Sequence, residues 1–413
     1  MQSVKEVILT STNTSGTWTA TVYNYITGSV IATHKKPNVS YRHLQIINDT
    51  YLIATDTKNP YLYYWSLHKP SHTQHQRLIT PGIVTALSCT PDGSYIVLAV
   101  DEKIFIYQAS TGQLLQTLSR HYQAVTNICF NSDGSSFATC GDDGFVFLWC
   151  LTDVINNYNQ AAPYREFSDH TLPVKSIYLG NFGIMSRLVT VSLDKTARIY
   201  NASTGDCLAT LIFDTALMSV CLDSNESNLF IGCSNGIIKY LNLRCLPRDL
   251  NVDIENNSVS LQGHSNQVTH LSISVDCMTL ISGDVDGKIN IWDIPSRQIV
   301  RSIMCQSPVL TATLIPNFSN STSELNCKYT IPPFERPNHE KKNNVIQIST
   351  SKNDDFLLNE DLYLRNNNQS RRCNSNSSSR VFRKNIIATE KMEKINSELY
   401  QYMIQYLIDN DKR

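Results

Sequence analysis

The stretch GHSNQVTHLSISVDCMTLISGDVDGKINIWD, residues 263–293, shows the clearest strand pattern in the chain. Apolar and polar residues alternate in two short runs from Val268 onward, which indicates two half-buried strands joined by a turn. A second turn at Asp286-Gly287 precedes a third apolar run that ends at Trp292. Because Asp-Gly turns favour tight hairpins, the stretch predicts a small antiparallel sheet.

The same pattern recurs elsewhere in the chain. The runs VTALSCTPDG, VTNICFNSDG and VTHLSISVDC align without gaps from Val84, Val125 and Val268. A His stands four residues before the first-strand Val in three repeats, at His121, His170 and His264. Agreement at several offsets at once indicates a structural repeat of about 40 residues.

The number of third strands predicts the number of repeats. Seven segments are candidates, at 18–25, 62–66, 104–107, 145–149, 197–200, 237–241 and 288–292. Val309–Ile315 resembles a further first strand, whereas the N-terminal repeat lacks one. We therefore expect residues 309–315 to pair with the N-terminal sheet and close a ring, because closure removes the exposed edge of an open array.

These marks resemble those of the WD40 family of β-propellers. Gly263-His264 and Trp292-Asp293 carry both dipeptides that characterise its repeat, and Trp149-Cys150 carries part of the second. The resemblance implies an all-β fold, a seven-bladed WD40 propeller over residues 1–316.

In such blades a His, a second-strand hydroxyl, an Asp and a Trp form a buried hydrogen-bond chain. The residues expected to form these structural networks are His121, Thr139, Asp143 and Trp149; His170 and Asp194; and His264, Ser282, Asp286 and Trp292. A His–Asp pair would also suit a catalytic dyad. Its recurrence at one spacing in several blades favours a structural role, and half-satisfied buried networks cost about 1–3 kcal/mol.

Other sequence features argue against an enzyme and against a cofactor. Gly232-Cys-Ser234-Asn-Gly236 fits the G-x-S-x-G pattern, but a strand-like run follows it where a nucleophile elbow requires a helix. No phosphate-binding or zinc-binding motif is present, and the twelve cysteines include no Cys-x-x-Cys pair. The net charge of −1 argues against wholesale electrostatic binding of nucleic acid, and no apolar run reaches the ~20 residues of a membrane span.

The propeller pattern stops after Pro316. Residues 317–387 are rich in Asn, Ser and Pro, so we expect a mostly disordered linker. Its basic residues resemble a bipartite nuclear-import signal: Arg371, Arg372, Arg380, Arg383 and Lys384. A merely solubilising basic linker is the alternative interpretation.

Residues 388–410 contain no Gly or Pro and show a heptad spacing of apolar residues. This spacing predicts an amphipathic helix. Its apolar stripe, the candidate partner-binding surface, consists of Met392, Ile395, Leu399, Tyr402, Met403, Tyr406 and Leu407. Two heptads are short for an independent coiled coil, so we expect a partner. A second copy in a homodimer, another protein and the chain's own propeller all remain open.

Longer stretches resemble one WD40 family in particular. Residues 118–130, 168–174, 192–200, 213–220, 263–274 and 394–407 are similar to the WD-repeat protein 18 family of ribosome assembly. That resemblance implies a nuclear (nucleolar and nucleoplasmic), non-catalytic scaffold subunit of the rixosome, which acts in rRNA spacer processing. It further implies a helical-repeat scaffold and a HEAT-type subunit as partners, the midasin ATPase, the pre-ribosomal particle, and a family link to DNA replication.

A second candidate contact surface comes from the repeat pattern itself. His121 points inward in that pattern, so Arg120 and Tyr122 should flank it at the mouth of the propeller. Arg and Tyr are favoured at binding hot spots. A cytoplasmic WD40 substrate receptor or signalling scaffold is the alternative function. The residues leave direct contact with RNA or DNA open.

Overall fold

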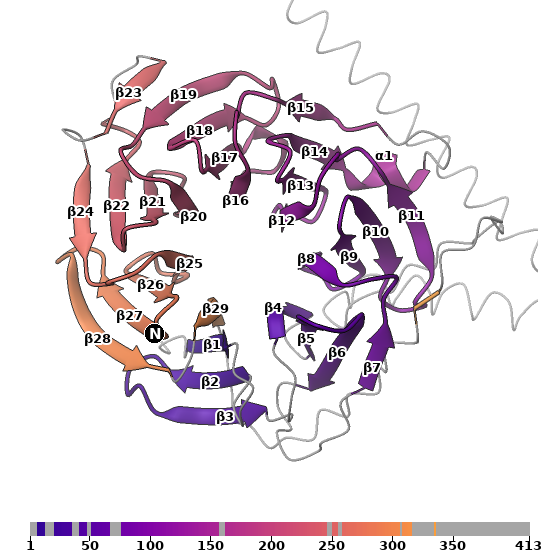
Figure 1. The fold of residues 1–413 in the computed structure, drawn as a ribbon, viewed down its shortest axis with the longest axis horizontal. Helices are drawn as coiled ribbons and strands as arrows, with labels where there is room; N and C mark the ends of the chain where they lie inside the picture. The colour runs from indigo at the N-terminus through magenta and orange to yellow at the C-terminus, as the bar shows by residue number, and fades with distance from the viewer. Residues whose placement is uncertain are drawn as a thin grey trace, which may run out of the picture. The chain divides into compact units, whose positions relative to one another are not determined.

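The computed structural model arranges seven sheets, the blades, around a central axis (Figure 1). It describes residues 6–12, 20–34, 41–47, 51–66, 76–156, 162–245, 250–254, 258–305, 308–315 and 334–335. This is the predicted seven-bladed propeller. The predicted import signal and the predicted helix at 388–410 lie outside the described residues.

The first three blades contain twelve strands, which follow one another from the centre of the ring outward. Blade 1 contains β29 (Val309–Ile315), β1 (Val7–Thr12), β2 (Ala20–Asn24) and β3 (Val30–His34). Blade 2 contains β4 (Tyr41–Ile47), β5 (Tyr51–Asp56), β6 (Tyr61–Ser66) and β7 (Gln76–Ile79). Blade 3 contains β8 (Val84–Cys89), β9 (Tyr95–Val100), β10 (Lys103–Gln108) and β11 (Leu114–Leu118).

The remaining four blades follow in chain order. Blade 4 contains β12 (Val125–Phe130), β13 (Ser136–Gly141), β14 (Val146–Cys150) and β15 (Arg165–Phe167). Blade 5 contains β16 (Val174–Leu179), β17 (Arg187–Ser192), β18 (Thr196–Asn201), β19 (Cys207–Ile212) and β23 (Asn251–Asp253). Blade 6 contains β20 (Leu217–Leu222), β21 (Asn228–Cys233), β22 (Ile237–Asn242) and β24 (Val259–Gln262). Blade 7 contains β25 (Val268–Ile273), β26 (Thr279–Asp284), β27 (Lys288–Asp293) and β28 (Gln298–Met304).

All seven predicted third strands are present, as β2, β6, β10, β14, β18, β22 and β27. The short helix α1 (Leu151–Asn156) and the 3-10 helix η1 (Gly183–Met185) were not predicted. Nor was β23, which belongs to the blade 6 segment of the chain but pairs in parallel with β19, the outermost strand of blade 5. Figure 1 shows β23 outside β19.

The ring is closed by a pairing between the two ends of the propeller sequence. Strand β29 lies antiparallel to β1, from Val7 opposite Ile315 to Thr12 opposite Val309. The hydroxyls of Ser11 and Thr311 are 2.8 Å apart across this pairing. Blade 1 therefore combines one C-terminal strand with three N-terminal strands.

The hydrophobic core lies between adjacent blades, since each blade packs both of its faces against neighbours. Between blades 7 and 1, for example, Ile8, Ile281, Val309 and Ala312 form one fully buried cluster. This arrangement explains why third strands such as KINIWD read as near-continuous apolar runs, with their four central residues buried.

The alternating strand directions give the ring two faces. The loops between blades and the turns between second and third strands lie on one, the network face. The turns between first and second strands, and between third and fourth strands, lie on the other. Val7 and Ile315 also end there, so we call it the termini face. Glu6 anchors the chain on it by accepting a hydrogen bond of 3.0 Å from the backbone of Val275.

Placing a charge on β29 tests how strongly ring closure stabilises the propeller. Ala312→Asp buries a carboxylate in the core between blades 7 and 1, which should cost about 3–5 kcal/mol and lower the melting temperature by roughly 10 °C or more. Thr313→Asp is the matched control, because Thr313 borders the central cavity and should tolerate the same side chain. Equal melting temperatures for both variants and the unmodified chain, measured by calorimetry, would contradict a stabilising role for β29.

Candidate functional site

The polar residues singled out in the sequence meet between the blades, close to the network face. In blade 4, His121 Nδ1 is 3.0 Å from the Asp143 carboxylate, and its Nε2 is 3.0 Å from Thr139 Oγ1. Trp149 Nε1 donates to the same hydroxyl oxygen at 3.1 Å. A neutral imidazole with its proton on Nδ1 satisfies the chain, because the Thr139 hydroxyl can then donate to Nε2.

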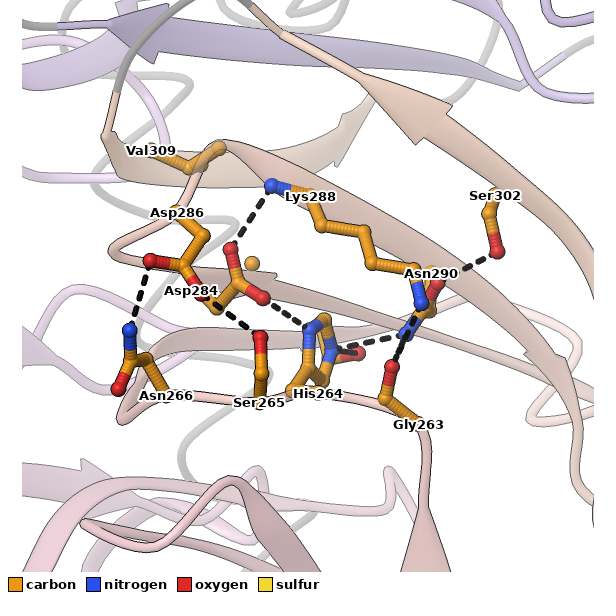
Figure 2. Close-up of polar contacts among 12 residues, drawn as sticks. Gly263, His264, Ser265, Asn266, Asp284, Asp286, Lys288, Asn290, Ser302 and Val309 are labelled. Carbon is orange, nitrogen blue, oxygen red and sulfur yellow. Dashed lines mark hydrogen bonds and ion pairs between the residues drawn. The ribbon is translucent and has the colours of Figure 1, made fainter.

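Blade 7 contains the same chain of groups, and Figure 2 shows His264, Asp284 and Asn290 from it. His264 Nε2 is 2.6 Å from Ser282 Oγ, which accepts a hydrogen bond of 2.8 Å from Trp292 Nε1. Asn290 Nδ2 lies 3.2 Å from His264 Nε2 and donates to the Gly263 carbonyl at 3.0 Å. Burial lowers the pKa of His264 despite the opposing effect of the neighbouring carboxylate, in keeping with a neutral ring.

The carboxylate in blade 7 corrects the assignment made from the sequence. His264 Nδ1 contacts Asp284, at 2.7 Å, and not Asp286. Asp286 lies at the surface, where it accepts hydrogen bonds from Ser265 and Asn266 at 2.7 Å each (Figure 2).

The last residue of the second strand explains the difference. Blade 4 has Gly141 at that position, and an added Cβ there would lie 2.7 Å from Asp143 and 2.8 Å from His121. Gly141 thus leaves space for the carboxylate of Asp143, two residues later. Blade 7 has Asp284 at the equivalent position, so its own carboxylate fills that space and Asp286 stays outside.

Blade 5 has a shorter version of the network. His170 Nδ1 is 2.8 Å from Asp194, and Nε2 is 2.8 Å from Thr190 Oγ1, a residue outside the predicted network. Tyr200 occupies the position of the Trp and instead donates to Asp169 at 2.9 Å. Burial alone would raise the pKa of Asp194, but hydrogen bonds from His170 and Thr196 outweigh it and lower the pKa well below its usual range.

The burial of these groups determines what chemistry they can perform. The side chains of His121 and His264 are 0% exposed, and that of Asp143 is 4% exposed. Since a general base must reach the proton it removes, a substrate cannot use these His–Asp pairs without opening the blade. Their arrangement holds the inter-blade loops in place, because the backbone N–H of Tyr122 donates to Asp143 at 3.0 Å.

The G-x-S-x-G motif and the described metal-ligand residue types also form no catalytic or metal-binding arrangement. Ser234 lies in the turn between β21 and β22, so its motif has strand–turn–strand geometry in place of a nucleophile elbow. Within the described ranges, no three His, Cys, Asp or Glu side chains group as metal ligands. No helix among those residues is long and apolar enough to cross a membrane.

The central cavity has a volume of about 610 Å³ and is lined by the first strands of the blades. Its wall mixes apolar groups with polar side chains such as Asn127, Ser176 and His270. Lys175 also borders it and pairs with Asp142 at 2.8 Å. The described part of the wall is therefore mixed polar and apolar, and its lining residues include no cluster of like charges.

An exposed surface lies directly above the blade 4 network. Tyr122 is 77% exposed, its ring centroid is 6.0 Å from that of Phe145, and Arg120 beside it is also exposed. Gly144, next to Phe145, lies close to the loop that carries the exposed Leu172. We call Arg120, Tyr122, Phe145 and Leu172 the Tyr122 surface. Tyr122 combines a backbone anchored by Asp143 with a free side chain, which is the arrangement that a preorganised contact requires.

The two aspartates of blade 7 provide a matched test of the network. Asp284→Ala leaves the buried His264 N–H without its acceptor, so the free energy of unfolding should fall by about 1–3 kcal/mol. Asp286→Ala removes an exposed carboxylate and should change the melting temperature little. Thermal and urea unfolding of both variants check this. A larger loss for Asp286→Ala would show that the surface hydrogen bonds, not the buried pair, stabilise the blade.

Comparisons with known proteins agree with this architecture. The family model for the WD domain, G-beta repeat matches residues 112–150 and 256–293, which include the third strands of blades 4 and 7. Among the described residues, blades 4 and 7 have networks that run from His to Trp.

Full-length relatives narrow the family further. WD repeat-containing protein 18 of Danio rerio is 35% identical over 343 residues, which cover 81% of this chain and 79% of the relative. Pre-rRNA-processing protein pro-1 of Caenorhabditis elegans is 30% identical over 275 residues, 64% of this chain and 52% of the relative. Pre-rRNA-processing protein IPI3 of Yarrowia lipolytica is 29% identical over 264 residues, 61% of each. The chain therefore belongs to the WD repeat-containing protein 18 family of WD40 β-propellers.

Proposed function

We propose that this chain is a non-catalytic scaffold subunit that acts in pre-rRNA processing during assembly of the large ribosomal subunit. The names of two groups of relatives, in nematodes and in a yeast, support the process. The burial of every His–Asp pair that the described blades contain supports the non-catalytic role. A propeller whose described His–Asp pairs are all buried would contribute by binding partners and raising their effective concentration.

The proposed setting is the nucleus, as part of the rixosome. Its partners would be a helical-repeat scaffold, a HEAT-type subunit, the midasin ATPase and the pre-ribosomal particle. The Tyr122 surface is the proposed contact within the propeller, and the helix predicted at 388–410 is the proposed contact outside it. The basic residues at 371–384 would serve nuclear import.

Acute depletion of the protein tests the process. Precursor RNA that contains the internal spacer should accumulate, and large subunits should fall relative to small ones, because a scaffold's loss stalls particles late in assembly. Northern analysis and subunit profiles within one or two cell doublings measure both. Unchanged precursors, together with a purely cytoplasmic tagged protein, would favour the substrate receptor and contradict the proposal.

The Tyr122 surface is tested by removing its two polar anchors together. Arg120→Ala with Tyr122→Ala should weaken recovery of at least one partner about tenfold or more, because Arg and Tyr are the side chains on which hot spots depend. The melting temperature should stay unchanged, since both side chains are exposed. Met185→Ala is the control, because Met185 is 75% exposed on the termini face. Normal partner recovery with the double variant would exclude this surface.

A further inference from the structure

The chain returns to the propeller after its last strand. Strand β29 ends at Ile315, yet Phe334 is buried, 8% exposed, within the core between blades 2 and 3. Its ring stacks on that of Tyr107, with centroids 4.3 Å apart and planes inclined by 15°. The next backbone N–H, of Glu335, donates to the Gly112 carbonyl at 2.8 Å. Both contacts lie at the termini face, where β10 turns into β11.

Blade 3 lacks the group that completes the other networks. Tyr107 occupies the third-strand position of Trp149, but the second-strand position of Thr139 is Leu98. The Tyr107 hydroxyl is buried and has no hydrogen-bond partner among the described residues. Burial, reinforced by the nearby charge of Glu335, raises its pKa. The Tyr107 ring therefore has a stacking contact with Phe334, whereas Trp149 has a hydrogen bond to the Thr139 hydroxyl.

We propose that the Tyr107 ring and the Gly112 carbonyl form a docking site for an aromatic peptide segment, and that its occupant is the chain's own segment around Phe334. A stacked, buried aromatic ring and an adjacent backbone hydrogen bond are two independent contacts, one apolar and one polar. Together they position both the side chain and the backbone of the segment. This site lies outside the Tyr122 surface and on the opposite face of the ring.

Docking changes where the C-terminal region leaves the propeller. At about 3.3–3.6 Å per residue, residues 316–333 can span roughly 60 Å, ample to cross from blade 1 to blade 3. With Phe334 docked, residues after 335 start from the rim of blades 2 and 3, not from the end of β29. The tether to the helix predicted at 388–410 is then shorter, which raises the effective concentration of that region near this rim.

Hydrogen exchange of the full-length chain tests the site directly. The Glu335 amide should exchange about 10- to 100-fold more slowly in the unmodified chain than in Phe334→Ala, since losing the buried ring opens the segment. Tyr107→Phe and Glu335→Ala are the controls. The first keeps the stacked ring and the second keeps the backbone hydrogen bond, so both should retain the protection.

Two results would overturn the proposal. Exchange of the Glu335 amide at the rate of an unprotected amide in the unmodified chain would show that the segment is not docked. Protection that persists in Phe334→Ala would show that the aromatic ring does not hold it. In Phe334→Ala, we expect the Glu335 amide to lose its protection while the amides of blade 3 keep theirs. Retained protection in blade 3 excludes general unfolding as the cause.

Discussion

The pairing of β29 with β1 holds the seven blades in one closed ring. Each blade buries both faces against neighbours, so an open array would expose one apolar face at each end and a free strand edge in blade 1. Pairing β29 with β1 in one sheet covers both apolar faces and the free strand edge. It also brings Val7 and Ile315 together on one face.

The ring and its number of blades could be predicted because they follow from the local periodicity of the sequence. The hydrogen-bond partners of the His side chains could not, because they depend on the space available between the blades. Asp143 and Asp286 have the same offset from the following Trp, yet only Asp143 reaches its His. The difference lies in whether Gly or Asp ends the second strand, at Gly141 and Asp284. The SGDVDG sequence contains two candidate aspartates, Asp284 and Asp286, and choosing the one with the same spacing to Trp as in blade 4 gave the wrong residue. The Gly141 comparison was the available signal.

The pairing of β23 and the burial of Phe334 could not be predicted from the sequence for a different reason. Strand β23 has three residues, and its pairing with β19 crosses from one blade's segment to another's sheet. Phe334 lies in a segment whose composition predicts disorder, yet its side chain is buried. A single aromatic residue forms no periodic pattern that could predict this burial. Both contacts are determined by a surface that exists only after the blades have formed. The local sequence pattern therefore predicts the blades, and the surface of the folded blades determines these two contacts.

Ring closure also has a consequence for synthesis of the chain. Strands β1–β3 are synthesised before the strands of the other six blades, but their innermost partner is at residues 309–315. At about 5–20 residues per second, β1–β3 are synthesised on the order of 15–60 s before β29, the innermost strand of blade 1. Throughout that time β1 presents an unpaired edge, the kind of edge that recruits strands from other chains. Pairing with β29 therefore covers an edge of β1 that stays open while the rest of the propeller is synthesised.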